Sequence, residues 1–309
     1  MPFQAILDDI TATLQQELQQ HGPGGQVASY IPALARVPAG QIGMALRTRD
    51  GQEAVAGAGA QPFSIQSISK VFTLTLAMRH YGEALWERIG REPSGNPFNS
   101  LVQLEFEHGT PRNPFINAGA IAVADRLVDL YGDAACAELT AFMSDLAGEP
   151  IGYDEEVAAS EATTGYRNHA LANFMKSFGR IDHPVQTVLD LYFHQCALSM
   201  SCLQLARAAG YLCRDGAHPL HDGPAIMTER QARRINALML TCGTYDAAGE
   251  FAYRIGLPCK SGVGGGIVAV VPDRLTLAVW SPPLDASGNS LLGQLALAQF
   301  VSRTGLSVF

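Results

Sequence analysis

The segment Gln66-Ser67-Ile68-Ser69-Lys70-Val71-Phe72 is the stretch around which the chain is organised. It joins a Ser-x-x-Lys motif to an apolar run that continues to Met78. On a helix, residues three apart share a face, so the Lys70 amine would reach the Ser67 hydroxyl. A hydroxyl is a weak nucleophile that needs a base beside it. Burial favours the neutral amine, so the segment predicts a Ser–Lys pair at the start of a buried helix.

This pattern is weak evidence by itself, because about one chance match is expected in a chain of this length. The position of Ser67 strengthens it, since a helix N-terminus offers free N–H groups and a positive dipole end. Catalysis by Ser67 and Lys70 therefore needs support from a second part of the chain.

The composition excludes several classes of protein. Hydrophobic residues make up 47% of the 309 residues and charged residues 16%, which is typical of a globular chain. The net charge of −8, without a basic run, disfavours nucleic-acid binding. No apolar run is long enough for a membrane span, and the N-terminus has no basic leader. The six cysteines form no C-x-x-C pair and indicate free thiols in a reducing cytoplasm.

Hydrophobic periodicity predicts a helix over 3–20, and then two strands over 42–48 and 53–57 with a turn at 49–51. A long helical region follows the Ser67 segment. Its helices are expected over 118–131, 134–147, 154–177, 185–197, 201–213 and 227–241. Strand character is expected to return from residue 250, with a hairpin of 267–271 and 275–280. A final helix is expected over 289–303.

This order predicts an α+β fold with one antiparallel sheet flanked by helices, plus an all-helical lobe. Both chain ends would contribute to the sheet. We expect a single catalytic domain, 1–309, with an α/β lobe of 1–66 and 245–309 and a mostly helical lobe of 67–244. The default place for a site is the cleft between the lobes.

A second motif, Lys260-Ser261-Gly262, lies just before the late hairpin and is followed by three glycines, Gly264–Gly266. Residues without bulk let a substrate approach the backbone of an edge strand. An amide N–H near Val263, paired with that of Ser67, would form an oxyanion hole, in which one donor is typically worth about 3–4 kcal/mol. The run does not fit a phosphate loop, because a strand follows it instead of a helix. A plain Gly-rich turn is the alternative.

Together, Ser67-x-x-Lys70 and Lys260-Ser261-Gly262 resemble the arrangement of serine β-lactamases and penicillin-binding proteins. More specifically, the chain resembles the bacterial serine-dependent glutaminases. The segments that carry this resemblance extend over nearly the whole chain: Ser29–Pro32, Gln66–Lys70, Ser94–Phe98, Asn113–Gly119, Glu161–Asn168, Asp190–Phe193, Cys242–Asp246 and Leu257–Gly266.

The resemblance implies hydrolysis of L-glutamine to L-glutamate and ammonia through a glutamyl-Ser67 ester, with no metal or cofactor. Ser67 would be the nucleophile and Lys70 its base. Tyr245 would share proton transfer, and the N–H groups of Val263 and Ser67 would bind the oxyanion. The groups that would hold the amino and carboxylate ends of the substrate are Tyr30, Asn117, Glu161, Asn168 and Tyr192. A homodimer or homotetramer is expected from the family.

The chain departs from the β-lactamase pattern in two ways. It has no Ser-Asp-Asn, and it carries Lys-Ser-Gly where Lys-Thr-Gly is usual, which leaves the role of Lys260 open between electrostatic and structural. Two other functions stay open at this point. One is a β-lactamase or esterase on the same fold, and the other is a sensor that binds glutamine without turnover.

Simpler interpretations exist for several candidate residues. Tyr30 and Tyr192 could be half-buried core tyrosines. Asn117 could be a helix N-cap, and Glu161 a solvated charge. The pair His218 and His221 is interpreted as a surface loop, because the sequence shows no third ligand at metal spacing.

Overall fold

The computed structural model describes residues 2–95 and 100–309. A five-stranded antiparallel sheet in the order β2-β1-β8-β7-β6 is its framework. The strands are β1 (Gly43–Thr48), β2 (Glu53–Gly57), β6 (Cys259–Ser261), β7 (Gly266–Val271) and β8 (Leu275–Trp280). Because β1 pairs with β8, the two ends of the chain form one sheet, and the predicted fold class is confirmed.

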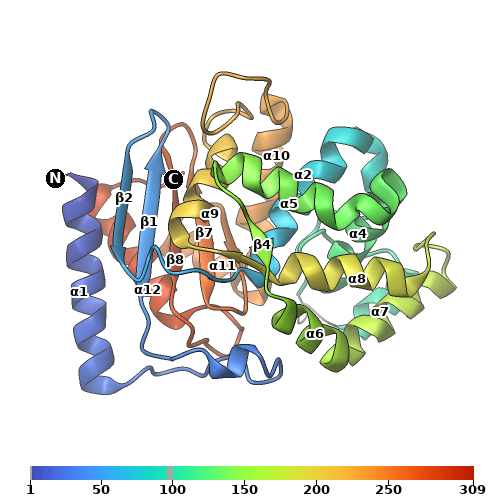
Figure 1. Ribbon diagram of the computed structural model, residues 1–309, viewed down its shortest axis with the longest axis horizontal. Coiled ribbons are helices and arrows are strands. Elements are labelled where there is room, and N and C mark those ends of the chain that lie inside the picture. The colour runs from blue at the N-terminus through green and yellow to red at the C-terminus, as the bar shows by residue number, and fades with distance from the viewer. Residues whose placement is uncertain (1, 96–99) are drawn as a thin grey trace.

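Two helices from opposite ends of the chain cover the outer face of this sheet (Figure 1). They are α1 (Phe3–His21) and α12 (Leu291–Thr304). The apolar stripe of α1, which includes Leu7, Ile10 and Leu14, shares one core cluster with inward residues of the strands. The short helix α9 (Cys202–Ala208) packs against β1 and β8.

The remaining helices lie mostly on the other side of the molecule (Figure 1). They are α2 (Ser69–Tyr81), α3 (Leu101–Phe106), α4 (Asn117–Tyr131), α5 (Ala135–Ala147), α6 (Glu155–Thr164), α7 (Tyr166–Ser177), α8 (Val185–Cys196) and α10 (Glu229–Cys242). The short helix α11 (Ala248–Arg254) instead shares the core cluster of α1 and α12 through Phe251. Every residue of α2 from Ser69 to Met78 is buried, as the apolar run predicted. A small sheet in the order β3-β5-β4 leads into this helix. Its strands are β3 (Phe63–Ser64), β4 (Gly152–Tyr153) and β5 (Leu198–Met200).

Three sequence-based boundaries differ from the structure. The single helix expected over 154–177 is two helices, α6 and α7, separated at Gly165. A Cβ at Gly165 would lie 2.5 Å from the Glu161 carbonyl oxygen, so the close turn suits glycine. The helix expected over 201–213 ends at Ala208 and continues as a 3₁₀ turn. Strand character from residue 250 is wrong, because 248–254 form α11, which buries Ala248 and Phe251 three residues apart.

Among the described residues, none of the helices combines the length and the apolar character that a membrane span requires.

Candidate active site

Ser67 lies in a 3₁₀ turn, Gln66–Ile68, directly before α2, and only 7% of its surface is exposed. The sequence placed it in the first turn of the helix, whereas α2 begins at Ser69. Its neighbour Gln66 has a φ of 51°, in the left-handed region that a side chain with a Cβ rarely adopts. Such strained backbone is concentrated at functional sites, so the turn is a candidate for holding a reactive side chain.

Lys70 is buried one residue into α2, with 1% of its surface exposed. Its Nζ donates to Asn117 Oδ1 at 2.7 Å and to the Phe115 carbonyl oxygen at 3.2 Å. The Asn117 amide donates in turn to Asn168 Oδ1 at 2.9 Å, which fixes its oxygen toward the amine. Burial lowers the pKa of Lys70 to about 8, although the charge of Glu161 opposes the shift. A neutral amine is therefore accessible near physiological pH.

Tyr245 begins a 3₁₀ turn that follows α10, and it too has a left-handed φ, 60°. Its hydroxyl donates to the Ser261 carbonyl oxygen at 3.3 Å. Burial raises the pKa of the phenol well above its ordinary value, and a hydrogen bond with the Ser67 side chain partly opposes that rise. The phenol thus stays protonated and lies next to the Ser67 hydroxyl, although the two residues are far apart in the sequence.

The end of β6 packs directly against the backbone that carries Ser67. A Cβ on Gly262 would lie 2.4 Å from the Ile65 carbonyl oxygen and 3.3 Å from the Ser67 nitrogen. Only a residue without a side chain permits this approach. Val263 follows, is 6% exposed and lines the same cavity as Ser67. The glycine motif therefore brings the late strand to Ser67, nearly two hundred residues away in the sequence.

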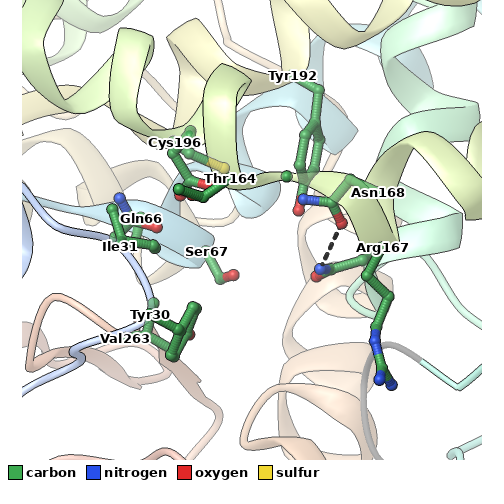
Figure 2. A pocket seen from close by; sticks show the side chains of 13 residues that line it. Tyr30, Ile31, Gln66, Ser67, Thr164, Arg167, Asn168, Tyr192, Cys196 and Val263 are labelled. Carbon is green, nitrogen blue, oxygen red and sulfur yellow. Dashed lines mark hydrogen bonds between the residues drawn. The ribbon is translucent and has the colours of Figure 1, made fainter.

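A cavity of about 370 Å³ opens over Ser67 and is lined by thirteen residues (Figure 2). The Ser67 hydroxyl points into it, with Tyr30 and Val263 on one side and Tyr192 and Asn168 on the other. Seven of the nine predicted site residues line it: Tyr30, Ser67, Asn117, Glu161, Asn168, Tyr192 and Val263. Lys70 and Tyr245 complete the site through their contacts with Asn117 and Ser67. The volume suits a small molecule.

Glu161 supplies the acidic group of the cavity and is only 6% exposed. Burial raises the pKa of its carboxyl to about 7, while a hydrogen bond with Gln66 and the charge of Lys70 act in the opposite direction. The interpretation of Glu161 as a solvated charge is therefore wrong. A buried carboxylate beside a cavity favours a cationic group of a ligand as its partner.

The simpler interpretations of three other residues also fail. Ile116 is the N-cap of α4, and Asn117 is its first helical residue, with its side chain bonded to Lys70 and Asn168. Tyr192 is 2% exposed and faces the cavity, so it is more than a half-buried core residue. Tyr30 is 58% exposed and lines the cavity from the segment before the first strands.

Comparison with known proteins assigns the chain to a family. The sequence model of the glutaminase family matches residues 25–309. The chain belongs to the glutaminase family. A glutaminase of Rhizobium meliloti is 57% identical over 99% of this chain and 96% of its own length. One of Rhodopseudomonas palustris (strain TIE-1) is 56% identical over 98% of both chains.

Solved glutaminases share the fold of this chain. The crystal structure of a probable glutaminase of Bacillus subtilis is 32% identical, with a TM-score of 0.90 over 99% of this chain and 97% of that one. A probable glutaminase of the same species complexed with 6-diazo-5-oxo-L-norleucine has a TM-score of 0.89, at 32% identity over 100% of this chain and 97% of that one. The chain is accordingly an amidohydrolase that acts on glutamine, and the family decides against a β-lactamase, an esterase or a sensor without turnover.

The sequence did not single out several residues of this glutaminase cavity. They are Ile31, Gln66, Thr164, Gly165, Arg167 and Cys196. Two of them had a detectable signal. Gln66 directly precedes Ser67, and Cys196 lies four residues after Tyr192 on α8, which places both on one helix face. Burial raises the pKa of the Cys196 thiol to about 12, so it is a neutral group in the cavity wall. Part of the Ser94–Phe98 segment lies outside the described residues.

The histidine pair was interpreted incompletely. His218 is 2% exposed, and its Nε2 lies 3.1 Å from Asp145, which is a third group that the spacing did not reveal. The His218 and His221 rings stack at 3.6 Å. In each ring Nδ1 accepts a backbone N–H, from Leu220 and Gly223 respectively. These contacts hold the loop, in which His218 is buried and His221 is exposed.

Proposed function

We propose that this glutaminase hydrolyses L-glutamine through an ester on Ser67, with Lys70 as the general base. The observation that carries the assignment is the arrangement around the Lys70 amine. Its two hydrogen bonds to described residues go to the Asn117 side chain and the Phe115 carbonyl, which are both acceptors. A neutral amine has two N–H donors and one lone pair. With both donors in use, the lone pair is left to take the proton of Ser67.

The reaction then has two half-reactions. The Ser67 Oγ bonds to the side-chain carbonyl carbon of glutamine while its proton passes to Lys70, and the N–H groups of Ser67 and Val263 stabilise the oxyanion. Collapse breaks the carbon–nitrogen bond, and Lys70 with Tyr245 returns the proton to the leaving nitrogen, which departs as ammonia. In the second half, the same pair removes a proton from water, which attacks the ester and releases glutamate and the Ser67 hydroxyl.

The polar lining supports binding of a free amino acid. Glu161 would pair with the α-ammonium group. Donors for the α-carboxylate would come from the Tyr30 and Tyr192 hydroxyls and from the Asn168 amide. Asn117 uses one amide N–H on Asn168 and its oxygen on Lys70, so it retains one N–H for the substrate. Asn117 would therefore link substrate binding to the base.

Glu161→Gln is expected to lower kcat/KM for glutamine by about 30-fold or more, mostly through KM. The change keeps the size of the side chain but removes the charge that would pair with the α-ammonium group. Steady-state ammonia release measures the effect. Glu155→Gln is a matched control, because it lies on the same helix and 79% of its side chain is exposed. An unchanged kcat/KM for Glu161→Gln would mean that this carboxylate does not bind the substrate.

We also propose that the chain is one catalytic domain of two lobes, 1–66 with 245–309 and 67–244. The cavity supports this division, since Tyr30 and Val263 come from the first lobe and Glu161 and Asn168 from the second. A cytoplasmic location is part of the same proposal. All six cysteines are free, and five of them are buried, which fits a reducing compartment.

A homo-oligomer is proposed as the working assembly. Exposed apolar side chains gather on α3 and α7, where Val102 is 66% exposed, Phe106 81% and Tyr166 78%. Val102 and Tyr166 line one hollow, so the two helices present a joint surface. We expect the purified chain to sediment as a dimer or tetramer and Phe106→Asp to shift it toward monomer. A wild-type chain that sediments as monomer at micromolar concentration would contradict the proposal.

A further inference from the structure

Lys260 is a fully buried amine that the mechanism above does not use. It lies on β6, at the edge of the main sheet, with 0% of its surface exposed. Its Nζ donates to the Ser261 carbonyl oxygen at 2.5 Å. The same nitrogen lies 4.8 Å from the centre of the Tyr245 ring and 5.9 Å from that of Phe115. No carboxylate of the described residues forms an ion pair with it.

Such an amine is costly to the fold. Burying an ionisable group without an ion partner is unfavourable. An apolar side chain of similar length would fill the site without burying an amine that forms one hydrogen bond to the described residues. Lys260 is therefore not explained by the stability of the fold, and its contacts with neighbouring residues indicate what it does.

Two of the contacts of Lys260 involve groups that also bind Tyr245 or Lys70. The Ser261 carbonyl that accepts from Lys260 also accepts from the Tyr245 hydroxyl, at 3.3 Å. Phe115, whose ring lies near the Lys260 amine, accepts a hydrogen bond from Lys70 through its carbonyl oxygen. Lys260 thus lies between Tyr245 and Phe115, the residue whose carbonyl oxygen binds Lys70. Lys260 itself does not line the cavity.

Tyr245 needs such external support. Its φ of 60° is in a region that glycine and asparagine tolerate better than an aromatic residue. Backbone of this kind persists only where the surroundings fix it. The Lys260 amine lies over the Tyr245 ring and donates to the Ser261 carbonyl, which also accepts from the Tyr245 hydroxyl. It would therefore restrict both the ring and the hydroxyl of Tyr245.

We propose that Lys260 is a positioning residue that holds the Tyr245 hydroxyl against Ser67 through the shared Ser261 carbonyl and the Tyr245 ring. This inference rests on the proposed role of Tyr245 in proton transfer. It assigns Lys260 a place in the chemical step and none in binding of glutamine.

Lys260→Met tests the inference, because methionine has a similar length and no donor. We expect kcat to fall about 100-fold, the usual effect of a small misplacement of a catalytic group. KM for glutamine should stay within about threefold of wild type, since Lys260 does not line the cavity. The temperature of thermal unfolding should be unchanged or higher. Lys176→Met, an exposed lysine on α7, is the matched control.

A double-mutant cycle gives the decisive readout. In a Tyr245→Phe background, Lys260→Met should lower kcat by less than about threefold, because the hydroxyl that Lys260 positions is already gone. Effects that multiply in the two backgrounds would overturn the inference, and so would a Lys260→Met enzyme with near-normal kcat. A Tyr245→Phe enzyme with near-normal kcat would instead contradict the proposed role of Tyr245 itself.

Lys260→Gln covers the case in which the methionine variant does not fold. Glutamine keeps an N–H donor on a shorter stem, so we expect a kcat between those of wild type and the methionine variant, again with KM preserved. If both variants fold and lose kcat equally, the hydrogen bond is not the means of positioning and the inference is wrong. If neither folds cooperatively, the role of Lys260 is structural, and the inference is equally wrong.

Discussion

Ser67→Ala is expected to lower kcat for ammonia release from glutamine by roughly 10⁶-fold, as removal of a hydrolase nucleophile does. The alanine cannot form the ester, so neither half-reaction can proceed by the proposed route. Binding should survive, because Glu161 and the other lining groups are untouched. Coupled detection of ammonia measures the rate, with glutamine and asparagine assayed side by side. Calorimetric titration with glutamine measures the binding that remains.

Ser69→Ala is the matched control for this change. Ser69 lies two residues further along, is fully buried, and its hydroxyl has no hydrogen-bond partner among the described residues. We expect near-normal activity from it. Acid-quenched wild-type enzyme should carry a glutamyl adduct on the peptide that contains Ser67, and the Ser67→Ala variant should carry none. Substantial ammonia release by the Ser67→Ala variant would remove Ser67 from the chemistry.

The parts of the fold that follow from local pattern were predictable. The 275–280 run is apolar apart from Thr276 and follows a Pro-Asp-Arg turn, and it forms β8 with the expected boundaries. The mostly apolar run after Lys70 predicted a helix buried on nearly all sides, and α2 is buried from Ser69 to Met78. The shared sheet followed from the same reasoning, since two hairpins at opposite ends of a chain can hide their edges by pairing.

Other features depend on contacts between distant segments, which a local pattern cannot show. Glu161 is surrounded by small polar residues in the sequence, and only the packing of α6 against α8 buries it. The division between α6 and α7 depends on how closely Gly165 approaches Phe193. The segment 248–254 is helical because of the face that it buries, although strand character was expected from residue 250.

The candidate site was predictable from the family resemblance more than from the residues themselves. Spacing alone pointed to Ser67 and Lys70, and the glycines pointed to Val263. Nothing in the spacing placed Asn117 beside the Lys70 amine, to which a 2.7 Å hydrogen bond joins it. The hydrogen bond of Gln66 to Glu161 also required the coordinates, since the two residues are far apart in the sequence.

Lys70→Met is expected to lower kcat by about 10³–10⁴-fold, close to the upper range for loss of a general base. Methionine fills the space of the lysine stem but cannot accept the proton of Ser67. It also leaves the Asn117 oxygen and the Phe115 carbonyl without a donor, which should cost about 1–3 kcal/mol of stability. Thermal unfolding therefore has to be measured beside activity, with Lys176→Met as the control. A folded Lys70→Met enzyme with more than a tenth of wild-type kcat would exclude Lys70 as the base.

The dependence of kcat/KM on pH gives an independent measurement of the same group. Burial places the pKa of Lys70 at about 8. The active form under the proposal is the neutral amine. The wild-type value should therefore rise with pH and level off above 8. Glu161, with a pKa of about 7, must be ionised to bind the α-ammonium group. As the pH is lowered, kcat/KM should therefore decrease more steeply below pH 7. The pH profile of kcat/KM reports the titrating groups of the free enzyme. The transition near pH 8 should therefore be absent from the residual activity of Lys70→Met. If that transition persisted, another group would be the base.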